Sequence, residues 1–416
     1  MTLLRTSLWN GIAVLVKMLT LLGINKVLAI YVGPVGYATV GQFQNAVQMI
    51  TVFASGAINT GVTKYTAEHA GDAKSLVALW RTAGTITIFG SIVTGIFVAL
   101  FSSPLALYFL GGVEYKFVFV CLASTLLMLT LNSLFLAILN GKKEIRGYVI
   151  ANIAGSLFAL LITCVLAVVY GLYGALIALA TYQAAAFLAT VLVCKGTDWF
   201  AVKNFYGAVD KVIATNLGKF VLMALTSAIC APLAQIIIRS HLSEKFGLQE
   251  AGYWEAMWRL SAAYLMFVTT TLSVYLLPRL SEIDNKSELR SEILQSYKLI
   301  IPAVIVGSII IYVLRDFIIT LLFAANFSPM RDFFAWQMIG DTLKIGGWLL
   351  AYLMLGKAMY KLYVIAELVY AFGFVGLAFL FTNWFGSIGV AMAHTAIYVV
   401  YWVVVGYATY PMLNDK

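Results

Sequence analysis

Long apolar stretches separated by short polar connectors run through the whole chain. An α-helix needs about 20 mostly apolar residues to cross the hydrocarbon core of a bilayer. On that criterion the pattern predicts twelve transmembrane helices, at approximately residues 8–32, 37–62, 82–104, 117–140, 147–170, 174–194, 217–240, 253–277, 299–325, 333–357, 361–382 and 387–410. The connectors at 33–36, 170–174 and 383–386 are turn-like. Continuous spans joined by such turns indicate an all-α bundle, because a β-barrel shows short alternating segments instead.

The composition supports a membrane protein and excludes other classes. Only 11% of residues are charged and 62% are hydrophobic, whereas a soluble domain carries about 25% charged residues. A cytosolic enzyme, a secreted disulfide scaffold and a nucleic-acid-binding domain are therefore excluded, despite the formal charge of +9. The first apolar run, 8–32, is too long for the apolar core of a signal peptide, so we expect it to be a retained span.

Basic residues in the connectors predict the orientation of the chain. Cytoplasmic loops of membrane proteins are enriched in Lys and Arg. One alternating set of connectors holds little more than Lys116, Lys245 and Arg331. The opposite set is much more basic, with Lys64, Lys74, Arg81, Lys142, Lys143, Arg146, Lys195, Lys203, Lys211, Arg279, Lys286, Arg290, Lys298, Lys357 and Lys361. We therefore expect the second set and both termini in the cytoplasm.

The connector 195–216 divides the predicted spans equally. It suggests an N-terminal six-helix lobe at 1–194, a cytoplasmic linker at 195–216 and a C-terminal six-helix lobe at 217–416, an organisation common in transporters. The mixed-charge connector 278–298 has apolar residues at helical spacing and predicts a short amphipathic helix on the cytoplasmic surface.

Ionisable residues inside the spans are the main functional signal. Each costs about 3 kcal/mol at mid-membrane, so each needs an explanation. Seven are basic and four are acidic, namely Lys17, Lys26, Lys219, Arg239, Arg259, Arg315, Lys344, Glu255, Asp316, Asp341 and Glu367. The positive surplus predicts a basic interior cavity for an anionic substrate.

Several of these residues have structural alternatives. Glu255 with Arg259 at i,i+4, and Asp341 with Lys344 at i,i+3, can close as intrahelical ion pairs or line the cavity. For Arg239, Arg315 and Asp316, near the span ends, we expect side chains that reach the interface. Glu367 has no local partner of this kind and is more informative.

The lysines of the first span cannot both face one cavity on a straight helix. Lys17 and Lys26 are nine residues apart and point to opposite faces at 100° per residue. A bend at Gly23 would bring both to the cavity; otherwise Lys17, the deeper one, is favoured. Lys64 and Lys219 lie near the predicted cytoplasmic mouth, where Lys64 is equally well explained as a membrane anchor.

Proline and aromatic residues add two weaker hypotheses. Pro232 lies mid-span and predicts a kink, either static or acting as a gate. Most aromatic residues near the span ends are expected in the interfacial belt. A few near the cavity mouth would stack on sugars, but the sequence does not indicate which ones. The candidates are Tyr253, Trp254, Trp258, Trp336, Trp348 and Trp384.

Sequence motifs for catalysis are missing from the chain. There is no P-loop, no HExxH and no large periplasmic loop for a catalytic centre. The three histidines, His69, His241 and His394, are too scattered for a metal site. We expect neither an enzyme nor a bound metal or cofactor, which leaves a secondary transporter.

Several segments are similar to one family. The chain resembles the Wzx-type flippases of O-antigen units and of the enterobacterial common antigen (lipid III), within the multidrug/oligosaccharidyl-lipid/polysaccharide exporter superfamily. The resemblance covers essentially the whole chain and is carried by SLW at 7–9, Lys17 and Lys26, GP at 33–34, NTGVTKY at 59–65, KF at 219–220 with LMAL at 222–225, SVYLLP at 273–278, FSPMRDFFAWQMIGD at 327–341 and LK at 343–344.

This resemblance implies a fold, a substrate and an energy source. It implies two six-helix lobes in a V that alternate access across the bacterial inner membrane. The substrate would be an undecaprenyl-pyrophosphate-linked oligosaccharide whose charged head contacts the basic cavity while its tail stays in lipid. Proton or sodium coupling is implied too, with Asp341, Glu367 and Glu255 as candidates.

Three further questions stay open. A multidrug exporter of the same superfamily is an alternative, although its cavity would be expected to be acidic. A membrane polysaccharide polymerase or ligase is an alternative of a different class. The expected ligands are membrane lipids and the lipid-linked glycan. For protein partners there are two alternatives: the protein acts as a monomer alone, or it acts beside the polymerase and chain-length regulator of its pathway.

Overall fold

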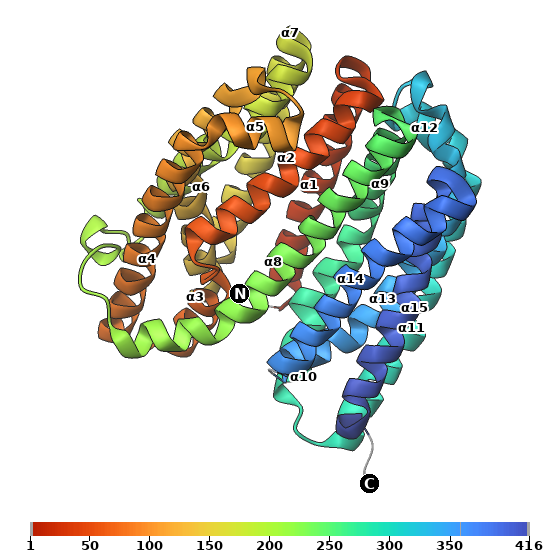
Figure 1. Ribbon diagram of the computed structural model, residues 1–416. Helices are drawn as coiled ribbons and strands as arrows, with labels where there is room; N and C mark the ends of the chain where they lie inside the picture. Colours follow the sequence, from red (N-terminus) through yellow and green to blue (C-terminus); the bar gives the residue numbers. More distant parts are fainter. Residues whose placement is uncertain (1–2, 358, 414–416) are drawn as a thin grey trace. The chain divides into compact units, whose positions relative to one another are not determined.

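The protein is helical throughout the part of the chain that the structure describes. The computed structural model describes residues 3–357 and 359–413, apart from the side chains of 3–10, 219, 220, 222, 223 and 274 (Figure 1). Within these ranges no residue lies in a β-strand. The predicted all-α class is therefore confirmed.

The helices follow one another closely in the sequence. The first half contains α1 (Leu3–Tyr31), α2 (Gly33–Ser55), α3 (Asn59–Glu68), α4 (Ala73–Leu100), α5 (Ser102–Leu110), η1 (Val113–Tyr115), α6 (Lys116–Gly141), α7 (Ile145–Cys194), η2 (Val202–Asn204) and α8 (Lys211–Phe246). The second contains α9 (Leu248–Thr271), the π-helical η3 (Leu272–Leu276), α10 (Leu277–Glu282), α11 (Lys286–Val313), α12 (Arg315–Leu322), η4 (Ala325–Phe333), α13 (Phe334–Gly356), α14 (Tyr360–Phe385), η5 (Gly386–Ile388) and α15 (Gly389–Leu413).

Many of these helices have the length and apolarity of membrane spans. In the described residues, eight stretches qualify: Gly11–Tyr31, Ala73–Leu100, Val113–Gly141, Ile145–Cys194, Ala224–Phe246, Lys286–Val313, Ala325–Gly356 and Tyr360–Leu413. Two of them hold two helices each, since α7 turns at Gly171 and the last stretch comprises α14 and α15. The chain is a multi-pass membrane protein.

Glycine makes the tight turns that the sequence predicts. Gly33, Gly171 and Gly386 have φ of +67°, +56° and +68°. These values lie in the left-handed region, which glycine adopts without steric cost. Each of the three ends one membrane-length helix and starts the next, so the chain reverses without a long loop.

Several predicted elements differ from the structure. The predicted spans 82–104 and 299–325 are interrupted at Phe101 and Leu314, where α4 is followed by α5 and α11 by α12. The predicted span 37–62 is interrupted: α2 ends at Ser55, where Gly56 with φ +65° forms a left-handed cap, and α3 starts at Asn59. The separate amphipathic helix expected within 278–298 is wrong. Asn285 caps a helix that runs without a break into the apolar part of α11, so that segment is the polar end of a longer helix.

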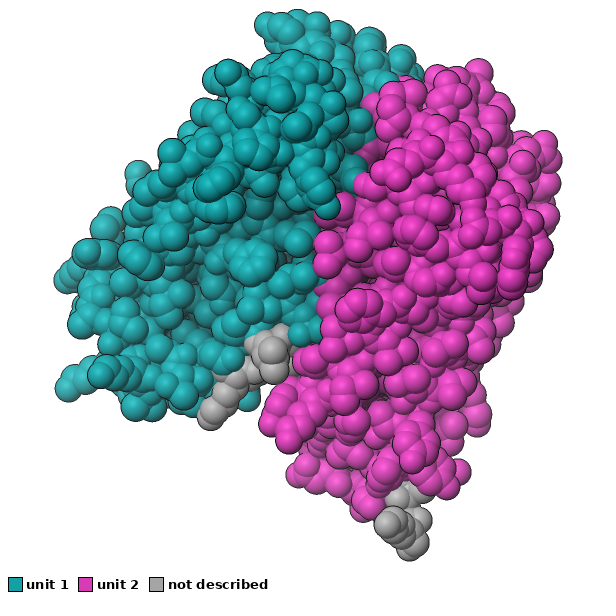
Figure 2. Space-filling view, viewed as in Figure 1, with its two compact units in different colours: residues 1–32, 39–229 teal, residues 33–38, 230–416 magenta. Residues whose placement is uncertain are grey.

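The chain forms two compact units (Figure 2). Unit 1 comprises residues 1–32 and 39–229, and unit 2 comprises 33–38 and 230–416. The division therefore falls inside α8, between Ile229 and Cys230. The lobes at 1–194 and 217–416, with a linker at 195–216, stay a prediction.

The first turns of α2 belong to unit 2 because they pack closely on its helices. A Cβ built on Gly252 of α9 would lie 1.8 Å from the carbonyl oxygen of Pro34, so the two backbones touch. The ring of Tyr37 lies 5.1 Å from that of Phe327 in η4. These contacts hold residues 33–38 against α9 and η4.

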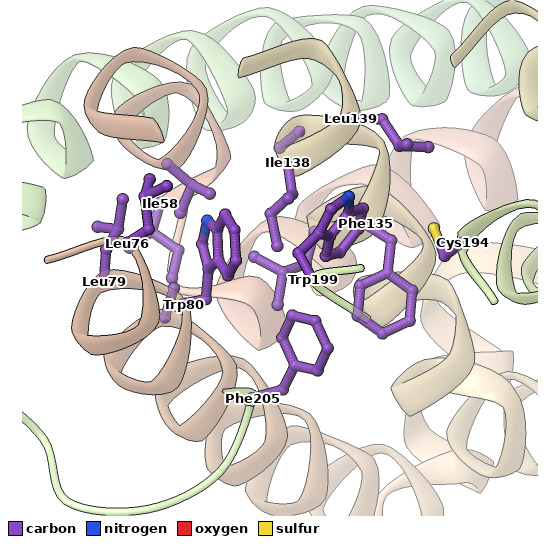
Figure 3. Packing of buried hydrophobic residues seen from close by; sticks show 14 of the residues in the cluster. Ile58, Leu76, Leu79, Trp80, Phe135, Ile138, Leu139, Cys194, Trp199 and Phe205 are labelled. Atoms are coloured by element: carbon purple, nitrogen blue, oxygen red, sulfur yellow. The ribbon is translucent and has the colours of Figure 1, made fainter. Parts of the chain in front are cut away.

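The connector after α7 completes the core of unit 1. Trp199 and Phe205 are buried beside Trp80 of α4 and Phe135 of α6 (Figure 3). The Trp199 indole donates a hydrogen bond to Glu144 at 2.9 Å, and the Trp80 indole donates to Thr66 Oγ1 at 3.0 Å. This part of the predicted linker is thus a packed element of unit 1.

Substituting Gly84 tests this packing. A Cβ at Gly84 would lie 2.0 Å from the carbonyl oxygen of Phe205, so Gly84→Ala must push the connector off α4. Overpacking of this kind costs about 1–3 kcal/mol, and we expect a lower melting temperature in detergent. Gly218→Ala is the control, because a Cβ at that position would meet nothing within 4 Å beyond its own helix. Equal melting of the two variants would contradict the close approach.

Candidate functional site

Four helices of unit 2 contribute side chains to one polar and aromatic cluster. On each helix these residues are spaced three or four positions apart, which places them on one face. Helix α15 packs along both α13 and α14, and α9 packs against α13. The faces are Trp254 and Trp258 on α9; Gln337, Asp341, Lys344 and Trp348 on α13; Glu367, Tyr370 and Phe374 on α14; and His394, Tyr398 and Tyr401 on α15.

A buried carboxylate holds two arginines at one side of the cluster. Glu255 accepts from Arg239 of α8 at 2.5 Å and from Arg259, one turn along α9, at 2.7 Å. The guanidiniums also lie over the rings of Trp254 and Tyr37, at 5.6 and 5.4 Å. The predicted Glu255–Arg259 ion pair is present, so this carboxylate has a structural role.

The expectation that Arg239 reaches the interface is wrong. Its side chain is 1% exposed, because Glu255 neutralises it inside the unit and the Trp254 ring covers it. Sequence spacing gave no sign of this pair, since the partners lie on different helices.

A second carboxylate joins three helices. Asp341 of α13 accepts from Tyr264 of α9 at 2.5 Å, from His394 of α15 at 3.0 Å and from Gln337 at 3.3 Å. Asp341 and His394 are both 0% exposed. A carboxylate only accepts hydrogen bonds, so Nε2 of His394 carries the proton in this contact. Spacing allowed Asp341 to pair with Lys344; among the described residues of unit 2 it pairs with His394 instead.

Lys344 instead lies among aromatic rings. Its Nζ is 5.1 Å from the ring centre of Trp258, 4.7 Å from that of Trp348 and 5.8 Å from that of Tyr398. Ring faces attract a cation through their quadrupoles. The three rings thus hold the ammonium in a fixed position.

Glu367 is linked to the same cluster through tyrosines. It accepts from the Tyr401 hydroxyl at 3.3 Å. The Tyr401 ring lies 5.9 Å from that of Tyr398, which also contacts the His394 ring at 4.9 Å. Glu367 and Asp341 are therefore connected through edge-to-face contacts of Tyr401, Tyr398 and His394, although they lie on different helices.

The remaining predicted residues lie elsewhere. Lys17 is exposed and Lys26 half-buried on α1, which is helical through Gly23 without the unwinding that would bring both to one face. Lys64 on α3 is exposed, with Nζ 5.6 Å from the ring centre of its neighbour Tyr65.

Two predicted residues lie on α8. Lys219 has its backbone there, and its side chain is outside the described residues. Pro232 is buried within the same helix, which continues on both sides of it.

Sequence reasoning missed His394, Tyr264 and Gln337. His394 lies inside the predicted span 387–410, so it is an ionisable residue within the membrane, as Asp341 is. Because the histidines were considered only as metal ligands, His394 was not selected. No local signal marks Tyr264 or Gln337. Among the described residues, no group of three His, Cys, Asp or Glu side chains is placed to hold a metal ion.

Charged side chains buried inside a multi-pass helical bundle are typical of membrane transporters, where they lie along ion and substrate pathways. The chain is a member of the polysaccharide biosynthesis protein family, which matches residues 3–284. The lipid III flippases of Escherichia coli (strain K12) and Shigella flexneri are each 32% identical to it over 405 residues, covering 96% of this chain and 96% of theirs. The predicted resemblance is confirmed.

Solved structures show the fold. A multidrug resistance MATE family transporter of the MOP superfamily, in an inward-facing conformation, matches with a TM-score of 0.76 at 16% identity, over 95% of this chain and 94% of that one. The lipid II flippase MurJ, in an inward closed conformation, matches with a TM-score of 0.73 at 12% identity, over 98% and 87%. The protein therefore has the fold of this transporter superfamily.

Proposed function

We propose that the protein is a flippase that moves an undecaprenyl-pyrophosphate-linked oligosaccharide from the cytoplasmic to the periplasmic leaflet of the bacterial inner membrane. The observation that carries this proposal is the 32% identity to lipid III flippases over 96% of both chains. The lipid III unit of the common antigen is the favoured cargo, and an O-antigen unit is the alternative.

Other functions have weaker support. The multidrug transporter shares the fold at 16% identity, which says little about its cargo. The similar proteins named above are flippases and transporters rather than enzymes, so a polymerase or ligase is not favoured.

The proposed topology has twelve spans in two six-helix lobes that form a V and alternate access, with both termini in the cytoplasm. The eight membrane-length stretches, two of them double, support it together with α2 and α9, which are 23 and 24 residues long. The boundary between the compact units lies within three residues of Pro232. This position supports Pro232 as the hinge of the gate.

The proposed substrate contacts are basic, and the proposed coupling groups are acidic. The burial of Asp341 among three hydrogen-bond donors supports it as the first candidate for proton or sodium coupling. Glu367 is the second candidate, and Glu255 is better explained by its two arginines. The residues proposed to attract the pyrophosphate or glycan are Lys17, Lys26, Lys64, Lys219, Arg259 and Lys344. The polymerase and chain-length regulator of the pathway are proposed partners.

Complementation tests the proposed function. Expressed in a strain without its lipid III flippase, the protein is expected to restore surface common antigen, measured by immunoblotting. Lys17→Ala and Lys219→Ala are expected to reduce the rescue at unchanged abundance, since each removes a positive charge, whereas Gly218→Ala is the control. Absence of rescue in this strain and in strains lacking an O-antigen flippase would refute the function.

A further inference from the structure

Trp258, Trp348 and Tyr398 surround the ammonium of Lys344, and this Lys344 cluster combines apolar ring faces with hydrogen-bond donors. Trp258 and Trp348 are partly exposed, while Tyr398 is buried. Trp348 packs on the apolar cluster of Leu265, Val304 and Ile345. Trp258 stacks on Phe374, with ring centres 6.3 Å apart and planes 21° apart. Both indoles are thus held in place and present fixed apolar surfaces.

The ammonium and the two indole N–H groups of the Lys344 cluster have no hydrogen-bond partner among the described residues. Lys344 carries three N–H donors and each indole carries one, yet hydrogen bonds join none of them to the described residues. The ring faces hold the ammonium without using its N–H groups. Five donors next to flat apolar surfaces are therefore available to a ligand.

Neighbouring carboxylates determine which ligand fits. Asp341 lies one turn from Lys344 on α13, and Glu367 is connected through Tyr401 and Tyr398. The single charge of Lys344 is therefore balanced locally. A pyrophosphate with about two negative charges would be repelled by the Asp341 carboxylate next to Lys344, whereas a sugar ring would not.

We infer that Trp258, Lys344, Trp348 and Tyr398 form a subsite for a pyranose ring of the glycan, not for the pyrophosphate. The C–H face of the sugar stacks on an indole, and its hydroxyl or acetamido oxygens accept from Lys344 and the indole N–H groups. This inference rests on the proposed function and specifies which residues contact the sugar. Lys344 then acts as a hydrogen-bond donor, not as a charge for the pyrophosphate.

Binding to the purified full-length protein tests the subsite. Isothermal titration calorimetry in detergent would compare two soluble probes, the oligosaccharide released from lipid III and inorganic pyrophosphate. We expect the oligosaccharide to bind, and Lys344→Met and Trp348→Leu each to weaken it about tenfold, the change that 1.4 kcal/mol represents. Neither substitution is expected to change the affinity for pyrophosphate.

Controls separate this result from misfolding and from failure of the proposed function. Trp384→Phe removes an indole that is 66% exposed on α14 and should bind like the wild type, and thermal melting checks that every variant is folded. Three outcomes would overturn the subsite: unchanged oligosaccharide affinity in both folded variants, Lys344→Met and Trp348→Leu; no oligosaccharide binding to the wild type; or loss of pyrophosphate binding in Lys344→Met. Complementation by the wild type is measured separately, so a flippase without this subsite would still be recognised.

Discussion

Replacing Glu255 with Gln is expected to lower the free energy of unfolding by about 3–5 kcal/mol, the usual cost of removing one partner from a buried ion pair. Glu255 faces Arg239 at 2.5 Å and Arg259 at 2.7 Å, and these arginines are 1% and 8% exposed. Without the carboxylate, two buried guanidiniums would keep their charges and repel each other. The aromatic rings above them offset only part of this cost.

Thermal unfolding in detergent measures this effect. Glu255→Gln should melt well below the wild type, and Glu244→Gln, which alters an exposed carboxylate of α8, should melt like it. Adding Arg259→Met to Glu255→Gln removes one of the two uncompensated cations and should recover part of the loss, because neighbouring substitutions are not additive. If Glu255→Gln and Glu244→Gln melted alike, the arginine cluster would not stabilise unit 2.

Helix positions could be predicted because their causes are local. A run of apolar residues determines where a helix can cross a membrane, and glycine determines where the chain can turn sharply, as at Gly171 and Gly386. The break between α2 and α3 was missed because residues 56–58 are themselves apolar or small. Hydropathy does not distinguish such a cap from a continuing span.

Contacts between helices could be predicted only in part. Spacing shows that Gln337, Asp341, Lys344 and Trp348 share one face of α13, but not which helix that face meets. His394 is 53 residues from its partner Asp341. Spacing alone allowed an ion pair between Asp341 and Lys344 as one of two alternatives, yet a histidine on α15 and a tyrosine on α9 lie closer to the carboxylate.

Comparing Asp341→Asn, which keeps the shape of the side chain but removes its charge, with Asp341→Ala is expected to separate the role of Asp341 in transport from its role in packing. Asp341→Ala leaves the donors of Tyr264, His394 and Gln337 without their acceptor. Each buried group left unpaired costs about 1–3 kcal/mol. We therefore expect the free energy of unfolding of this variant to fall by at least about 3 kcal/mol. Asp341→Asn keeps the volume and one accepting oxygen, and should lose considerably less.

If Asp341 binds the coupling ion, the ranking of its variants by transport should differ from their ranking by stability. Because an amide carries no negative charge at any pH, Asp341→Asn should be folded and abundant yet rescue the flippase-null strain at least about tenfold less than the wild type, close to the level of Asp341→Ala. Asp341→Glu, which restores the charge, should recover part of the rescue. The measurements are surface common antigen, membrane abundance and melting temperature for all three variants. Rescue by Asp341→Asn equal to that of the wild type would leave Asp341 with a packing role only, and would move the coupling proposal to Glu367.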